Sequence, residues 1–104
     1  ITLNSEEFME ARIEKIIIET LKELNEDLEN DSFINPNSKT KLYGGNGAMD
    51  SLALVSFIAD LDDKISDEFE KDIILADEKA MSAKTSPFRN IESLTSYIKS
   101  LLEN

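Results

Sequence analysis

The sequence predicts a small all-α protein, a bundle of three main helices and one short helix. In three separate segments apolar residues recur every three to four positions, as they do on one face of a helix. Polar stretches rich in Asn, Ser and Gly separate these segments, and no two apolar runs could pair as strands. At 104 residues the chain has the size of one domain, 1–104. We expect helices over about 4–30, 51–66, 77–82 and 90–103, and a long loop over 31–50.

The first predicted helix carries a long apolar stripe and a clear start. Asn4 or Ser5 can cap it, and Glu6 and Glu7 place negative charge at the positive end of the helix dipole. The apolar positions are Phe8, Ile13, Ile16, Ile17, Leu21, Leu24 and Leu28.

The segment 31–50 lacks this periodicity and predicts a loop. Pro36 and the run Gly44-Gly45-Asn46-Gly47 oppose regular structure. Its four large apolar side chains are expected to hold the loop against the bundle; they are Phe33, Ile34, Leu42 and Tyr43.

The second helix is predicted to begin at Asp50-Ser51, and it is amphipathic. Its apolar stripe consists of Leu54, Phe57, Ile58, Leu61 and Ile65, and the residues expected to face away are Ser56, Asp60, Asp62 and Asp63.

Beyond the second helix, 73–75 is interpreted as an extended connection packed on the core, because the chain has no partner strand for it. A short helix over 77–82 should stop before Pro87. Asn90 can cap the last helix.

The composition excludes several classes of function. The chain has no Cys and no His, which removes Ser-His and Cys-His nucleophile pairs and zinc sites built from these residues. A net charge of −11 repels nucleic acid and anionic lipid, and it favours protein partners with Lys and Arg patches. No apolar run reaches the length of a membrane span, and no basic region leads into a hydrophobic stretch as in a signal peptide. We therefore expect a cytoplasmic, monomeric protein that neither binds nucleic acid nor inserts into a membrane.

The stretch from Gly47 to Leu52 is the candidate functional motif. Here a glycine-rich loop places the hydroxyl of Ser51 at the start of a helix. Backbone N–H groups are unpaired there and the dipole is positive, so a phosphoester on Ser51 would be stabilised. The alternative is a serine that merely caps the helix.

The stretch 50–65 resembles the modification site and second helix of acyl carrier proteins. The resemblance lies in Asp50-Ser51-Leu52, in an apolar residue four positions after the serine, and in two more after Ser56. It continues with a Leu followed by the paired acids Asp62-Asp63. The order of helices and loops extends it over nearly the whole chain, and the segment 86–94 is similar to the family's approach to its last helix.

This resemblance implies an acyl carrier protein-like four-helix bundle without catalytic residues of its own. It implies that a phosphopantetheinyl transferase attaches 4′-phosphopantetheine to Ser51, flanked by Asp50 and Leu52, and that the arm carries an acyl group as a thioester. It also implies that acyl-transferring or ligating enzymes bind the carrier through their basic patches. The residues expected to contact these patches are Val55, Asp60, Asp62 and Asp63.

Departures from the family pattern favour a dedicated carrier of a specialised pathway over one for general fatty acid synthesis. The length of the chain alone leads us to expect a bacterial, stand-alone carrier. Ser56 stands where many members have an acid, and Met49 where a small or polar residue is usual. The large side chains Phe57, Phe88 and Tyr97 favour short or polar cargo, because they would fill the interior.

Other classes of function fit less well. Asp60-Leu61-Asp62 begins like a calcium-binding EF-hand loop, but Ile65 replaces the required Gly and Lys71 the required Glu. A hydrolase would have to use carboxylates alone. The alternative that stays open is a small acidic helical interaction domain with an unmodified Ser51.

Overall fold

The computed structural model describes residues 4–44, 47, 49–75 and 87–103. Within these ranges the regular elements are all helical: α1 (Ser5–Leu28), the 3-10 turn η1 (Asp31–Phe33), α2 (Ser51–Phe69) and α4 (Ile91–Glu103). The predicted all-helical fold is therefore confirmed. The short helix predicted over 77–82 lies outside the described residues. In the described ranges no helix combines the length and the apolar character needed to cross a membrane.

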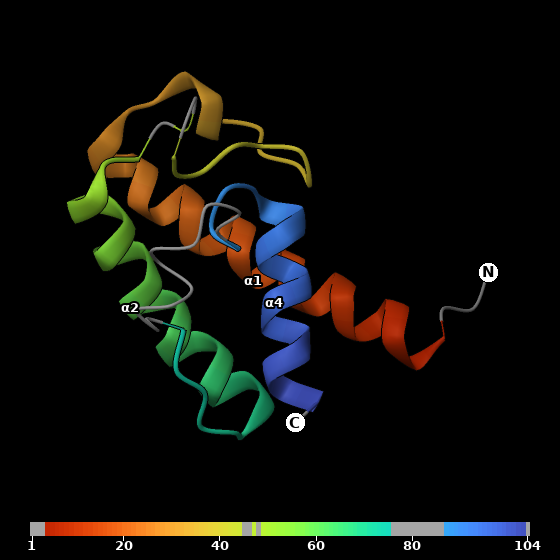
Figure 1. Ribbon diagram of the computed structural model, residues 1–104. Coiled ribbons are helices and arrows are strands. Elements are labelled where there is room, and N and C mark those ends of the chain that lie inside the picture. Colours follow the sequence, from red (N-terminus) through yellow and green to blue (C-terminus); the bar gives the residue numbers. More distant parts are fainter. Residues whose placement is uncertain (1–3, 45–46, 48, 76–86, 104) are drawn as a thin grey trace.

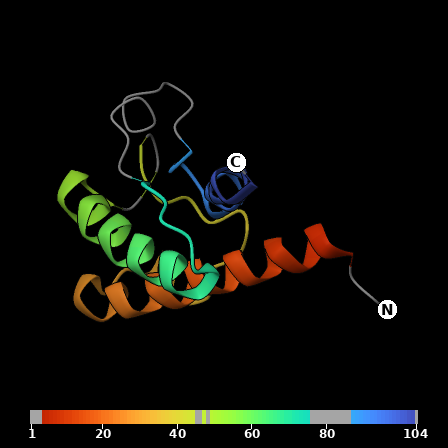
Figure 2. The ribbon, with the colours of Figure 1, turned by 90° about the horizontal axis from the view of Figure 1, so that it is seen from below.

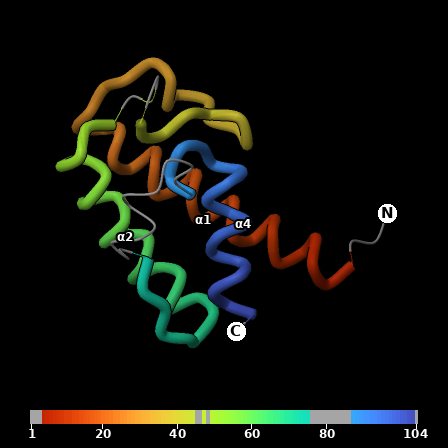
Figure 3. Tube along the Cα trace, in the orientation of Figure 1, coloured from red at the N-terminus to blue at the C-terminus, as the bar shows by residue number. Residues whose placement is uncertain are grey.

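The long helix α1 is the element that the other two helices share. Both α2 and α4 contact it, and both lie on the same side of it (Figure 2). The amino-terminal end of α1 projects beyond the bundle (Figure 1). The C-terminus of α1 and the amino-terminal ends of α2 and α4 lie toward one end of the molecule, beside the loop that follows η1 (Figure 3).

The start of α1 follows its sequence signals. The Asn4 side chain accepts a hydrogen bond of 2.8 Å from the backbone N–H of Glu7, which satisfies one of the free donors of the first turn. The helix ends at Leu28, two residues before the predicted end, because Glu29 turns into the left-handed region at φ 52° and its N–H bonds to the Asn25 carbonyl.

The core contains most residues of the predicted apolar stripes. The prediction is wrong for Phe8 and Leu28, which are exposed because they lie near the two ends of α1. Its fully buried large side chains include Ile13, Ile17, Leu21, Phe33, Leu42, Leu54, Phe57, Leu61, Ile65, Leu75, Phe88 and Ile91. Phe33 and Leu42 hold the loop to the bundle as predicted, and Tyr43 packs half-buried at the edge of the core. The prediction for Ile34 is wrong, since its side chain is exposed. Phe33 ends η1 pointing inward, and the next residue of this tight turn points away from the core.

The helix α2 runs to Phe69, nearly one turn beyond the predicted end at 66. Phe69 packs against the core, and the guanidinium of Arg12 stands 4.6 Å from its ring centroid and pairs with Glu68. These contacts with α1 stabilise the last turn, although its local sequence is acidic and lacks a helical apolar pattern. Glu70 then ends the helix in the left-handed region.

The segment 73–75, predicted as an extended connection packed on the core, has no helical structure, and its side chains alternate between buried and exposed. Ile73 and Leu75 are buried whereas Ile74 is 73% exposed. The last helix begins as predicted, with the Asn90 Oδ1 accepting from the Ser93 N–H at 2.7 Å. Lys99 on α4 lies among three glutamates, with Glu10 of α1 at 2.9 Å, and this hydrogen bond raises the pKa of the ammonium.

The loop before α2 is tied to the start of α4. The N–H of Leu42 donates to the Arg89 carbonyl at 2.8 Å, and the N–H of Glu92 donates to the Ser38 carbonyl at 2.9 Å. An ion pair of 2.8 Å joins Lys39 to the Glu92 carboxylate. This anchoring fixes the loop relative to the helices that surround the start of α2.

Replacing Lys39 by Met is expected to raise the pKa of Glu92. The hydrogen bond and the charge of Lys39 hold this pKa below the ordinary value of 4.5. The pair therefore contributes its stability above pH 4.5, and the contribution is lost as the pH falls through the folded-state pKa. The effect on stability should be small because both side chains are exposed. Carboxyl carbon shifts of Glu92 measured against pH check this, and Lys41→Met, which removes a nearby exposed lysine, should leave them unchanged.

Candidate functional site

Ser51 lies exposed at the first position of α2. Its hydroxyl is therefore open to solvent at the positive end of the helix dipole, where a negatively charged substituent is stabilised. Another molecule can therefore reach this oxygen while the loop and the helix stay folded.

The cap of α2 is Asp50, which leaves Ser51 without a capping role. The Asp50 Oδ1 accepts from the N–H of Ala53 at 2.8 Å, and its carbonyl accepts from Leu54 at 3.0 Å. Asp50 has the extended backbone of an N-cap residue. Because Asp50 is the N-cap residue, the interpretation of Ser51 as a mere helix cap is wrong, and the Ser51 hydroxyl is not needed to cap the helix.

Among the described residues, a side chain from the loop is hydrogen-bonded to the Ser51 hydroxyl. The phenol oxygen of Tyr43 lies 3.2 Å from Ser51 Oγ, within hydrogen-bond distance. Tyr43 precedes Ser51 by eight residues, and no periodicity or motif relates them, so the sequence alone gave no signal for this contact. The Tyr43 backbone is held by an isolated bridge to Met49 and by the Met49 N–H donating to the Leu42 carbonyl at 3.0 Å.

Two residues explain how the chain folds back in this way. A Cβ on Gly47 would stand 2.7 Å from the Tyr43 Cα, so only glycine permits this close approach of the two backbone segments. Met49, which departs from the usual family pattern, is 5% exposed and belongs to the core. The methionine thus fixes the end of the loop directly before Asp50.

The exposed surface of α2 extends from Ser51 along one face of the helix. The exposed residues of this surface, called here the outer face of α2, are Ser51, Leu52, Val55, Ser56, Ala59, Asp60, Asp63 and Asp67. At about 100° per residue these positions cover the solvent-exposed half of the helix, with Ser51 and Asp60 near its two edges and Leu52 and Asp63 near its middle. Leu52 and Val55 are 77% and 53% exposed, so two apolar side chains lie directly beside the hydroxyl. Asp60 and Asp63 follow, about 14–18 Å further along the helix axis.

Of the three predicted docking acids, Asp62 differs from the other two. Its side chain is half-buried at the edge of the outer face, and it accepts a hydrogen bond of 3.4 Å from Ser66. Asp60 and Asp63 make no ion pair among the described residues. The structure therefore exposes Leu52, Val55, Asp60 and Asp63 on the solvent side of α2, whereas Asp62 is half-buried at the edge of that side where Ser51 also lies.

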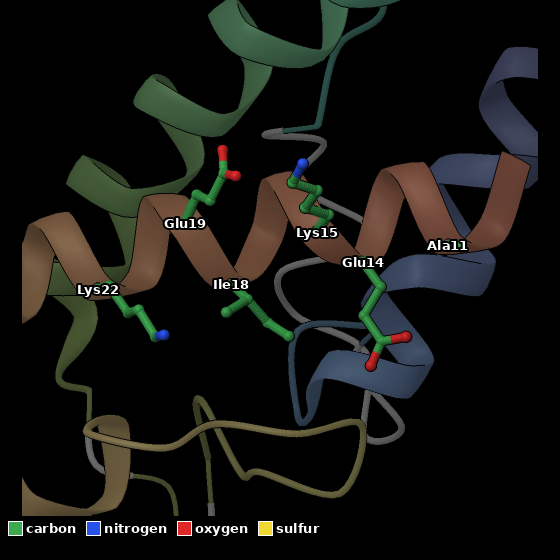
Figure 4. Close-up of a pocket in the computed structure, with 6 residues that line it drawn as sticks. All are labelled: Ala11, Glu14, Lys15, Ile18, Glu19 and Lys22. Atoms are coloured by element: carbon green, nitrogen blue, oxygen red, sulfur yellow. The ribbon is translucent and has the colours of Figure 1, made fainter.

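A concave feature lies on the surface of α1. It is a surface hollow of about 410 Å³ lined by Ala11, Glu14, Lys15, Ile18, Glu19 and Lys22, and Figure 4 shows that the side chains drawn project from this one helix. A binding site usually needs polar groups that converge from several elements. This hollow is accordingly a groove between side chains of one helix surface.

The calcium-loop alternative is incompatible with the local structure. Residues 60–69 are part of the continuous helix α2, whereas an EF-hand requires a loop whose oxygens surround the ion. Within the described ranges no group of three or more acidic side chains is arranged to hold a metal ion.

Comparison of the sequence with protein-family models and with curated proteins, and of the fold with solved structures, finds no match. The candidate site therefore rests on its own residues and geometry.

Proposed function

We propose that this chain is a carrier of the acyl carrier protein type, with 4′-phosphopantetheine attached to Ser51. The observation that carries the proposal is the exposed hydroxyl of Ser51 at the first position of α2, on the same solvent-exposed side of the helix as two exposed apolar side chains and two exposed acids. The three described helices agree with the three main helices of that fold. The short third helix of that fold, which we expect over 77–82, is part of the proposal.

The position of Ser51 suits a modified serine in three respects. Its hydroxyl is exposed, it is not needed as a cap, and it lies at the positive end of a 19-residue helix. In the modification, Ser51 Oγ would attack the β-phosphorus of coenzyme A, losing its proton to a base on the transferase. The Oγ–P bond forms, and the bond to the departing adenosine bisphosphate breaks. The arm supplies a thiol that carries the acyl group, which a chain without Cys lacks.

The outer face of α2 is proposed to dock the partner enzymes. Leu52 and Val55 offer an apolar contact next to the attachment point, and Asp60 and Asp63 offer charge to Lys and Arg patches. Charge pairs at such a rim speed association and break readily, as a carrier visiting several enzymes in turn requires. The protein is proposed to work as a cytoplasmic monomer that presents its cargo and catalyses no step itself. The length of the loop before α2 and the residues Ser56 and Met49 favour a specialised pathway over general fatty acid synthesis.

Incubation with coenzyme A, magnesium and a broad-specificity phosphopantetheinyl transferase is expected to add one phosphopantetheine to the wild type. Ser51→Ala should abolish the gain in mass completely. The variant should stay folded, with a change in stability within about 0.5 kcal/mol, because Asp50 and not Ser51 caps the helix. Intact-protein mass spectrometry measures the gain, and thermal unfolding measures the stability.

Ser5 provides the matched control. It is also exposed, is also the first residue of a helix, and also follows a capping residue, Asn4. Ser5→Ala should take up phosphopantetheine as the wild type does. A wild type that gains no mass would sink the carrier proposal and favour the unmodified interaction domain.

A further inference from the structure

We propose that Tyr43 is a positioning residue for Ser51, whose phenol holds the serine hydroxyl in one orientation for modification. The inference rests on the proposed function of Ser51 and concerns a residue of a different segment, the loop before α2. It follows from a single contact, the 3.2 Å between the Tyr43 phenol oxygen and Ser51 Oγ, and from the way in which the loop fixes Tyr43.

The loop holds Tyr43 on both its backbone and its ring. Leu42, directly before it, is fully buried and donates its N–H to the Arg89 carbonyl at 2.8 Å, while its carbonyl accepts from Met49. The ring of Tyr43 is half-buried against the core. The phenol oxygen therefore has a defined place, whereas an exposed serine hydroxyl on its own would rotate among three staggered rotamers.

The chemistry of the two hydroxyls sets the direction of the hydrogen bond. A phenol is a stronger acid than an aliphatic alcohol, so we assign Tyr43 as donor and Ser51 Oγ as acceptor. This bond uses one lone pair of Ser51 Oγ. The other lone pair is left for the new bond to phosphorus, and the serine proton is left for the base on the transferase. A donor does not make the oxygen more nucleophilic, so the contribution of Tyr43 is orientation.

The size of the effect follows from the rotamers. Holding one of three wells raises its population by at most about threefold, and better alignment within the well adds to this. Loss of the phenol hydroxyl is therefore expected to lower the turnover of modification by about two- to fivefold. Docking uses the outer face of α2, which Tyr43→Phe leaves unchanged, so the KM for the carrier should not move.

The test compares Tyr43→Phe with Tyr97→Phe, the same change at the chain's other tyrosine. Tyr97 lies on α4 and packs edge-to-face against Phe88 with the ring centroids 5.9 Å apart. Two readouts are measured, the kcat and KM for modification by the transferase, and the Hα–Hβ coupling constants of Ser51 in the unmodified protein, which report its rotamers. We expect Tyr43→Phe to lower kcat and to average the couplings, and Tyr97→Phe to change neither.

A second variant, Gly47→Ala, is designed to displace Tyr43 by shifting its backbone. The Cβ of Gly47→Ala would meet the Tyr43 N and Cα at 2.7 Å, so the loop must shift and carry the phenol with it. The same averaging of the Ser51 couplings is expected although the phenol is retained. Gly44→Ala cannot serve as the control although its Cβ would meet nothing within 4 Å, because Gly44 has a φ of 82° and any side chain there strains the loop. Tyr97→Phe therefore remains the control for both variants.

The outcomes separate the two proposals. A wild type that takes up no phosphopantetheine overturns the proposed function, and this inference with it. A wild type that is modified, with unchanged kcat and unchanged Ser51 couplings in Tyr43→Phe, overturns the role of Tyr43 alone. A faster reaction in Tyr43→Phe overturns it as well, since the phenol would then restrain the hydroxyl.

Discussion

Replacing Phe57 by Ala is expected to destabilise the fold by about 3–5 kcal/mol, a large part of the stability of a small domain. Phe57 is fully buried in the middle of the apolar stripe of α2. The truncation removes the transfer free energy of the ring and leaves a cavity that a packed bundle closes only in part. Denaturant unfolding followed by circular dichroism measures the loss.

The same substitution tests how cargo relates to the interior. Phe57 and Phe88 are fully buried, and Tyr97 packs at the edge of the same core, so the wild-type interior is expected to admit short or polar cargo only. In Phe57→Ala, an acyl chain attached through Ser51 gains roughly 0.8 kcal/mol for each methylene that it buries in the new cavity. A long acyl chain should therefore stabilise the variant more than it stabilises the wild type.

Leu52→Ala is the control for this prediction. Leu52 lies on the same helix but is 77% exposed, so its truncation should change stability by no more than about 0.5 kcal/mol. Equal losses in the two variants would contradict the assignment of inner and outer faces of α2. Interior chemical shifts that change throughout the wild type on loading a long acyl chain would contradict the limit on cargo.

Much of the fold could be predicted because the signals for a helix lie in residues close together in the sequence. The stripe of α2 and the caps Asn4 and Asn90 are read from neighbours three or four positions apart, and all are found in the structure. Helix ends were less predictable. Glu29 and Glu70 end their helices in the left-handed region, and glutamate carries no signal for that role because glycine is the usual residue there.

The candidate site also has a part that could be predicted from local spacing and a part that depends on tertiary contacts. Its residues on α2 follow from the spacing of one helix, which predicts that Ser51, Val55 and Asp63 share a face. The contact of Tyr43 with Ser51 could not be predicted, because it depends on a loop held by tertiary hydrogen bonds from Leu42 to Arg89 and Met49. The partial burial of Asp62 was missed for a related reason, since it depends on how α2 is rotated against the core.

Reversing the charge of Asp60 and Asp63 on the outer face of α2 is expected to have the largest effect on partner recognition. The double substitution Asp60→Lys and Asp63→Lys raises the net charge from −11 to −7, and it places two cations where the partner is proposed to present its own. Electrostatic steering changes association rates by about 10- to 1,000-fold. We expect kcat/KM for modification of Ser51 to fall at least about tenfold at low salt.

The control must change the total charge equally at another place. Glu19 and Glu26 are exposed on α1 and make no ion pair among the described residues, and their replacement by Lys gives the same net charge. Steering by total charge would slow both variants alike, whereas docking on the outer face of α2 slows only the first. Because the Debye length shrinks from about 30 Å at 0.01 M salt to about 3 Å at 1 M, the difference should fade as salt rises. If the α1 variant is slowed as much as the α2 variant, Asp60 and Asp63 contribute to solubility and the partner docks elsewhere.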